Sequence, residues 1–146
     1  MPRLLICQLG GCGNDWKTDD EQRRRLVSRL HGGWTKSAHS EGLVIGIRTG
    51  LSAKEDIKLL EQINSEGIQI YFSVQEALDN KRDLYKELKT LGRKRICQIH
   101  ISETDGVTLP HSKNIDMHRV KEQLDKMGWS GWLVVERSRD AGMCVM

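Results

Sequence analysis

Five polar segments of this 146-residue sequence directly follow short apolar runs. They are residues 10–13 (GGCG), Arg48, residues 73–76 (SVQE), residues 100–103 (HISE) and Glu136. Histidine and carboxylate side chains can hold a divalent cation or move a proton, and a glycine-rich turn can approach a phosphate closely. These segments are therefore the candidates for a functional site.

The glycine-rich stretch GGCGNDWKT does not complete a known phosphate loop. The glycine that precedes the lysine in a Walker motif is Trp16 here, so Lys17-Thr18 does not finish the pattern, and the stretch does not spell GxGxxG either. We expect this segment to be a flexible exit from a strand.

His100 and Glu136 each have a structural and a functional interpretation. A histidine between two isoleucines of a strand is often a hydrogen-bonded structural residue, and Glu136 could form an ion pair with the adjacent Arg137. If both residues lie at the ends of successive parallel strands, however, they converge on one pocket, as in many metal and acid–base sites. The residues alone do not decide between the structural and the functional interpretation of His100 and Glu136.

The elements that must position these residues follow from hydrophobic periodicity. Strands are predicted at residues 4–9, 43–47, 68–72, 96–101 and 132–135. Helices are predicted between 19 and 40 with a break at Gly32-Gly33, over 53–64, over 79–91, and from the cap Asp116 to Gly128. Ser52 and Glu55 form a capping-box pattern before the second helix.

This βα alternation lacks hairpin signals and predicts an α/β fold with a parallel sheet, either an open doubly wound sheet or part of a (β/α)8 barrel. We expect one domain over residues 1–137 and a loose tail over residues 138–146. Trp129 and Trp132 flank Gly131 before the last strand, where both rings are expected to cap the bottom of the core.

Composition excludes several classes of protein. Charged residues make up 29% of the chain but the net charge is only +3, without the clustered basic surface that nucleic acids require. The longest uncharged apolar run, Leu43 to Ile47, is too short to cross a bilayer, so a cytoplasmic protein without a membrane partner is expected. The four cysteines contain no CxxC pair and are predicted to be free thiols.

Several segments resemble one family. The runs ICQIHISETDG and NIDMHRVKEQLDKMGWSGWLVVERS are similar to the closing part of the xylose-isomerase-like TIM barrels, the sugar phosphate isomerase/epimerase group. Upstream, IGIRTGLSAKEDIKLLEQI and IQIYFSVQEALDN resemble two earlier segments of the same family. The resemblance covers residues 43–137 well and residues 4–42 loosely. It implies that the five predicted strands are the fourth to eighth of an eight-stranded barrel, and so a partial (β/α)8 fold.

The resemblance also implies a site. Family members hold a divalent cation with Glu, Asp, His and Glu at the ends of the fifth to eighth strands. The histidine matches His100 and the last glutamate matches Glu136, which would be a metal ligand and the catalytic proton carrier. Arg48 and Ser73 occupy the other two ligand positions. Glu103 replaces a substrate-binding aspartate of the family.

From this resemblance we expect an isomerase or epimerase-like protein that acts on a sugar or sugar phosphate by metal-assisted proton transfer next to a carbonyl. Two of the expected ligands are replaced, so the cofactor is either Mn²⁺, Mg²⁺ or Zn²⁺ or none, and catalysis is an open question. We also expect Arg48 to take the place of the cation and pair with Glu136. The alternative is a non-catalytic interaction or regulatory module, whose open strand edges pair with a second copy or with another barrel chain.

Overall fold

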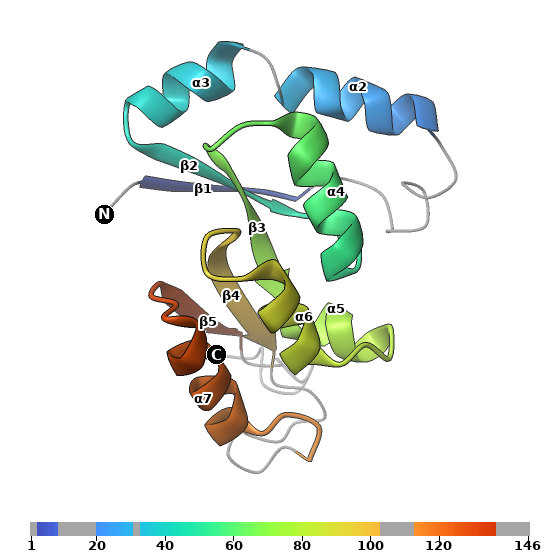
Figure 1. Ribbon diagram of the computed structural model, residues 1–146, viewed down its shortest axis with the longest axis vertical. Helices are drawn as coiled ribbons and strands as arrows, with labels where there is room; N and C mark the ends of the chain where they lie inside the picture. The colour runs from blue at the N-terminus through green and yellow to red at the C-terminus, as the bar shows by residue number, and fades with distance from the viewer. Residues whose placement is uncertain (1–2, 9–19, 31–32, 103–112, 137–146) are drawn as a thin grey trace, which may run out of the picture.

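The computed structural model of the protein describes residues 3–8, 20–30, 33–102 and 113–136 (Figure 1). These residues form one five-stranded sheet in the order β1-β2-β3-β4-β5, and every neighbouring pair of strands is parallel. The strands are β1 (Arg3–Gln8), β2 (Leu43–Arg48), β3 (Ile68–Ser73), β4 (Ile96–Ser102) and β5 (Trp132–Glu136). The predicted parallel α/β fold is therefore confirmed.

Six helices connect or precede the strands in the described parts of the chain. They are α2 (Asp20–Leu30), α3 (Gly33–Ser40), α4 (Ala53–Ile63), α5 (Val74–Asp79), α6 (Leu84–Leu91) and α7 (Met117–Met127). Helix α2 contacts α4, α4 contacts α6, and α6 contacts α7, so these helices form a row beside the sheet (Figure 1). None of the helices in the described segments is long and apolar enough to span a bilayer.

One hydrophobic core lies between the helix row and the sheet. Alternate residues of β3, namely Ile68, Ile70 and Phe72, are buried, whereas Gln69 and Tyr71 on the opposite face are partly exposed. The helices contribute their apolar stripes to the same core. Its largest fully buried side chains are Ile45, Ile47, Ile63, Leu88, Leu91, Ile99, Ile101, Val74 and Val120.

Local capping determines where the helices begin and end. Ser52 and Glu55 make the reciprocal bonds of a capping box at the start of α4, as the sequence predicts. Asp116 accepts a hydrogen bond from the backbone N–H of Arg119 at the start of α7, and Gly128 ends that helix in the left-handed conformation with φ 66°. Helix α2 ends at Leu30 and α3 begins at Gly33, so the chain from 19 to 40 contains two helices, as the predicted break indicates.

The predicted helix over residues 79–91 is present only from Leu84 to Leu91, as α6, and a separate helix that was not predicted, α5, precedes it over Val74–Asp79. Helix α5 begins directly after β3, where the Ser73 hydroxyl accepts a hydrogen bond from the Glu76 backbone N–H. It ends at Asp79, and Lys81 adopts a positive φ of 54°. Asp83 then caps α6 by accepting from the backbone N–H groups of Tyr85 and Lys86. The cap at Asp83 thus begins α6 as a helix separate from α5.

The sheet remains open, since β1 pairs only with β2 and β5 only with β4 among the described strands. At the amino ends of the strands, which we call the amino edge, lies a hollow of about 1170 Å³. Each strand contributes one of its first residues to the lining, namely Leu4, Val44, Ile68, Ile96 and Trp132. Five adjacent parallel βα units that do not close into a ring match the partial (β/α)8 barrel that the sequence predicts.

Candidate functional site

The predicted site residues gather at the opposite end of the sheet, which we call the carboxyl edge. Arg48 ends β2, Ser73 ends β3 and Glu136 ends β5. Ser73 lies opposite His100 in the β3–β4 register, and Ser102 lies opposite Glu136 in the β4–β5 register. Since all these strands are parallel, the backbone brings the four predicted positions to one edge. The side chain of Glu136, all of Glu103 and the glycine-rich segment 10–13 lie outside the described residues.

His100 and Ser73 are both buried, with exposed fractions of 6% and 5%. The ring of Tyr71 on the neighbouring strand lies 5.8 Å from the imidazole centroid and is tilted by 36°. The Ser73 hydroxyl accepts from the Glu76 backbone N–H at 3.4 Å and thereby caps α5. Ser73 therefore has a structural role at the position where the family resemblance places a metal ligand.

Arg48 forms an ion pair that reaches across to α5. Its Nε donates to Oε1 of Glu76 at 2.7 Å, and both side chains are partly buried, at 27% and 29% exposure. The sequence analysis expects Arg48 to pair with Glu136 instead. Because the Glu136 side chain is not among those described, that pairing stays a prediction. The contact with Glu76 already uses the Nε–H donor of the guanidinium.

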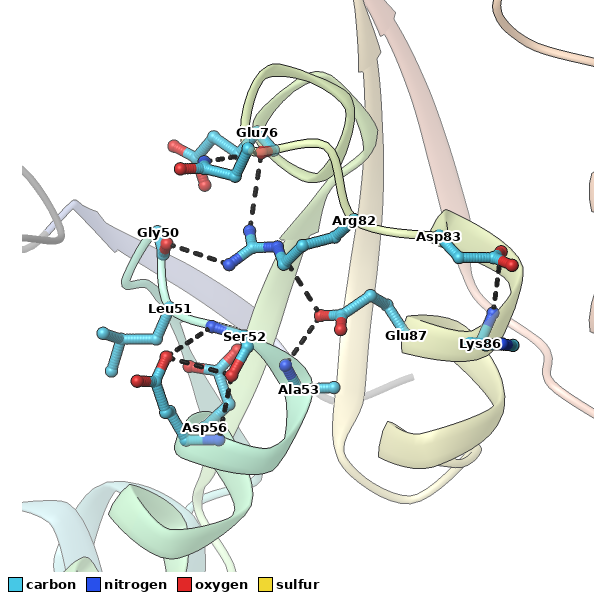
Figure 2. A network of polar contacts seen from close by, with 12 residues as sticks. Gly50, Leu51, Ser52, Ala53, Asp56, Glu76, Arg82, Asp83, Lys86 and Glu87 are labelled. Carbon is cyan, nitrogen blue, oxygen red and sulfur yellow. Dashed lines mark hydrogen bonds and ion pairs between the residues drawn. The ribbon is translucent and has the colours of Figure 1, made fainter.

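Arg82 connects three elements at the same edge (Figure 2). Its Nη1 donates to the carbonyl of Gly50 at 3.4 Å, and its Nη2 donates to the carbonyl of Glu76 at 3.5 Å. Its Nε lies 3.9 Å from Oε2 of Glu87, which also accepts from the Ala53 backbone N–H at 2.6 Å. A single guanidinium thus holds the loop after β2, helix α5 and helix α6 in place.

Asp56 is a buried acid beside this network. It is 4% exposed, and Thr49 Oγ1 donates to its Oδ1 at 2.5 Å. Burial raises the pKa of Asp56 from 3.8 to about 7, and the hydrogen bond from Thr49 and the charge of Arg82 counteract only part of this rise. Asp56 therefore carries much less negative charge near neutral pH than an exposed aspartate does.

Sequence reasoning missed Arg82, Glu87 and Asp56. Asp56 carries a detectable signal, because it is spaced three residues from Ala53 and from Leu59 on the apolar face of α4, where a charged residue is unusual. Arg82 lies in a short loop and its partners are 5 to 32 residues away. No local pattern identifies such a residue.

Cys97 is the free cysteine among the side chains that the structure describes, as predicted. Its Sγ donates to the carbonyl of Ile70 at 3.2 Å, and burial raises the pKa of the thiol to about 12. A thiol in this environment stays protonated and is a poor nucleophile.

The described residues do not fit a divalent cation. Hard cations such as Mg²⁺ and Mn²⁺ prefer carboxylate ligands. At the two positions that the resemblance assigns to carboxylate ligands, Arg48 carries a positive charge and Ser73 has a hydroxyl that already caps α5. Within the described ranges, no group of three or more His, Cys, Asp or Glu side chains is placed to hold a metal ion. No step through a metal is therefore derived for this chain.

Comparison with known families identifies this architecture. The family model described as "Xylose isomerase-like TIM barrel" matches residues 4–143. The chain belongs to this family. The resemblance found in the sequence is thus confirmed for the family and the fold. No curated protein sequence matches this xylose isomerase-like chain at a significant level.

Solved structures agree with the family assignment. An AP endonuclease of family 2 from Brucella melitensis superimposes with a TM-score of 0.73 at 13% identity and covers 92% of this chain. An L-ribulose 3-epimerase gives a TM-score of 0.76 at 15% identity over 94% of the chain. The 3-keto-D-glucoside 4-epimerase YcjR from E. coli gives 0.72 at 15% identity, also over 94%.

This xylose isomerase-like chain spans only part of those proteins. The match covers 54% of the AP endonuclease, 49% of the L-ribulose 3-epimerase and 57% of YcjR. At 13–15% identity the superpositions establish the fold. The chain thus has about half the length of the solved structures it matches.

Proposed function

We propose that this protein is a sugar isomerase/epimerase-like protein that binds a sugar or sugar phosphate at its carboxyl edge. Three lines of support are its membership in the xylose isomerase-like TIM barrel family, the sugar epimerases among its structural neighbours, and the polar residues that end its parallel strands. In parallel (β/α) barrels, substrates bind at this edge. His100, Glu103 and Glu136 are the proposed residues for ligand binding, and Glu136 stands at the position that the resemblance gives to the family's proton carrier.

The observation that carries the mechanistic part of the proposal is the Arg48–Glu76 ion pair at 2.7 Å. Metal-assisted proton transfer next to a carbonyl needs a cation to stabilise negative charge on oxygen and two carboxylates to move the proton. In this chain the resemblance assigns one carboxylate position to Arg48, whose guanidinium is paired with Glu76. We therefore propose a protein that keeps sugar binding and has lost metal-assisted isomerisation.

Proton exchange in D₂O tests this proposal on the full chain. A ketose is incubated with the protein and with Mn²⁺, Mg²⁺ or Zn²⁺, and deuterium next to the carbonyl is measured by NMR, while binding is measured by calorimetry. We expect saturable sugar binding and no exchange above the metal-only blank. Metal-dependent exchange by the wild-type chain would contradict the loss of isomerisation, and absence of any sugar binding would contradict the proposal as a whole.

A double variant provides a positive control. Arg48→Glu with Ser73→Asp restores two carboxylates to the ligand positions, although Ser73→Asp keeps an oxygen that can cap α5. We expect Mn²⁺ to raise the melting temperature of this variant and to leave that of the wild type unchanged, since a ligand that binds only the folded state stabilises it. An equal shift in both proteins would argue against Arg48 as the cause of the loss.

The second candidate function is an interaction module, and the exposed residues of β5 favour it. Trp132 is 65% exposed and Val135 is 47% exposed on a strand that pairs only with β4 in the described sheet. Large exposed apolar side chains on an open sheet edge favour association. Light scattering after size exclusion tests this idea. We expect a homodimer or larger oligomer that Trp132→Asp weakens, and a monomer at all concentrations would count against self-association.

A further inference from the structure

At the carboxyl edge, Arg48 has hydrogen-bond donors that are not used by the residues that the structure describes. Its Nε donates to Glu76, and this is the single hydrogen bond or ion pair that the guanidinium makes with the described residues. The side chain is 27% exposed, so it is neither immersed in the core nor free in solvent. A guanidinium has five N–H donors in a planar fork, and no described residue accepts from the two terminal nitrogens of Arg48.

Glu76 holds this guanidinium in a defined position because Glu76 is itself held on several sides. Its backbone N–H donates to the Ser73 hydroxyl, and its carbonyl accepts from Arg82 at 3.5 Å and from the Asn80 side chain at 2.7 Å. In Figure 2 the carbonyl of Glu76 lies beside the Arg82 guanidinium, which also reaches Gly50. A donor group fixed in this way loses little conformational freedom when a ligand binds.

The charges around Arg48 do not exclude an anion. Three carboxylates of the described part of this edge have partners: Glu76 pairs with Arg48, Glu87 lies near Arg82 and accepts from Ala53, and Asp56 accepts from Thr49. The two arginines balance Glu76 and Glu87, and burial raises the pKa of Asp56 toward neutrality. This arrangement differs from a cluster of carboxylates, which would attract a cation and repel an anion.

We infer that Arg48 is an anion anchor, so that the site prefers a sugar carrying a phosphate or carboxylate group over the neutral sugar. The inference rests on the proposed sugar-binding function and specifies its substrate class. A guanidinium fork binds both kinds of group through two parallel N–H···O bonds. The anionic group would thus occupy the neighbourhood of a position where the resemblance places a metal ligand.

Calorimetry with four ligands tests the inference on the full chain. The ligands are D-fructose, D-fructose 6-phosphate, D-glucuronate and inorganic phosphate. For the wild type we expect one of the two anionic sugars to bind about 10- to 100-fold more tightly than D-fructose, as a charge-assisted bidentate contact would give. Whichever anionic sugar binds more tightly, D-fructose 6-phosphate or D-glucuronate, shows whether the site recognises a phosphate or a carboxylate group. Inorganic phosphate alone should bind more weakly than the preferred sugar.

Variants assign the preference to Arg48. Arg48→Gln should remove the preference for the anionic sugar over D-fructose, whereas Arg48→Lys should keep part of the preference because it keeps a point charge without the fork. Arg24→Gln is the matched control, since Arg24 is an exposed residue of α2. Circular dichroism and melting temperatures show whether each variant is folded.

The possible outcomes separate this inference from the proposed function. Equal binding of D-fructose and both anionic sugars by the wild type would overturn the inference and leave sugar binding intact. A preference that survives in folded Arg48→Gln would overturn it as well. If no sugar of either kind binds the wild type, both the inference and the proposed function are wrong.

Discussion

At the carboxyl edge, the side chains of Arg48, Arg82 and Glu76 connect neighbouring elements. At the amino edge, apolar residues and charged residues of both signs line an open hollow of about 1170 Å³. The difference concerns how the polar groups are held. Glu87 at the carboxyl edge accepts a backbone N–H and lies near a guanidinium, but residues 93–95 (RKR) at the amino edge are exposed.

This contrast indicates which edge can perform specific chemistry. A binding site needs donors and acceptors that are already oriented before the ligand arrives, because ordering them on binding costs free energy. The carboxyl edge meets that requirement through contacts between groups far apart in the sequence, such as Arg48 with Glu76. The amino edge offers surface area and charge with less of this fixed geometry: Arg95 donates to the Leu91 carbonyl at 3.0 Å, whereas Arg93 and Lys94 are exposed. Such a surface suits association better than selective binding of a small molecule.

The largest effect is expected from the pH dependence of Asp56. The folded protein holds this proton more tightly than the unfolded chain does, because burial raises the pKa from 3.8 to about 7. The Asp56 contribution to the free energy of unfolding is therefore greatest below about pH 4, falls as the pH rises to about 7, and is constant above that, with a total fall of at most about 4 kcal/mol. Asp56→Asn should remove this part of the slope.

Urea denaturation at several pH values between 4 and 8 measures the effect as the difference between wild type and Asp56→Asn. Asp125→Asn is the matched control, since Asp125 is exposed on α7, and its profile should follow the wild type. Parallel profiles for wild type and Asp56→Asn would show that Asp56 does not titrate as a buried acid.

Removing the partner of Asp56 should have the next largest effect. Thr49→Val deletes the hydroxyl that donates to Asp56 and that accepts from the Leu51 backbone N–H. Leaving buried polar groups without a partner costs about 1–3 kcal/mol, and the pKa of Asp56 should rise further. Thr49→Ser keeps the hydroxyl and should lose less than half as much stability. Equal losses in the two variants would mean that the methyl group matters more than the hydrogen bond.

Glu87 allows the two edges to be compared directly. Glu87→Ala removes the acceptor for the buried Ala53 N–H and the partner of Arg82, and should cost about 1–2 kcal/mol. Glu87→Gln keeps an acceptor oxygen and should cost less. Glu61→Ala is the control at the amino edge, where the exposed side chain lines the hollow, and should change stability by less than about 0.5 kcal/mol. A similar cost for Glu87→Ala and Glu61→Ala in denaturant melts would remove the contrast.

The fold was predictable because its signals are local. Apolar runs, the capping box at Ser52 and the stop at Gly128 each occupy a few consecutive residues, and the absence of hairpin signals indicates parallel strands. The caps Ser73 and Asp83 are also local signals, and they mark the starts of α5 and α6. Leucine periodicity alone shows the apolar face of α6 but does not show where that helix begins.

The candidate site was predictable only as a set of strand ends. The register places Ser73 beside His100 and Ser102 beside Glu136, as parallel pairing requires. The partners of the side chains depend on packing between distant segments: Arg48 and Glu76 are 28 residues apart, and Arg82 reaches Gly50 from 32 residues away. Such contacts follow from the relative placement of helices, which one sequence does not determine.

Trp129, which precedes β5, and Trp132, the first residue of β5, provide the smallest expected effect and the sharpest test of the amino edge. Both were predicted to cap the core, and for Trp132 this is wrong, since it is 65% exposed. Trp129 packs against the core, its Nε1 donates to the Ile96 carbonyl at 3.0 Å, and its ring lies so close to Gly131 that a Cβ there would come within 2.6 Å of it. Trp129→Phe should therefore cost about 1 kcal/mol through the lost hydrogen bond, whereas Trp132→Phe should cost almost nothing. Thermal denaturation of the two matched variants measures the difference, and an equal loss in both would mean that Trp132 is covered in solution, as the interaction-module alternative requires.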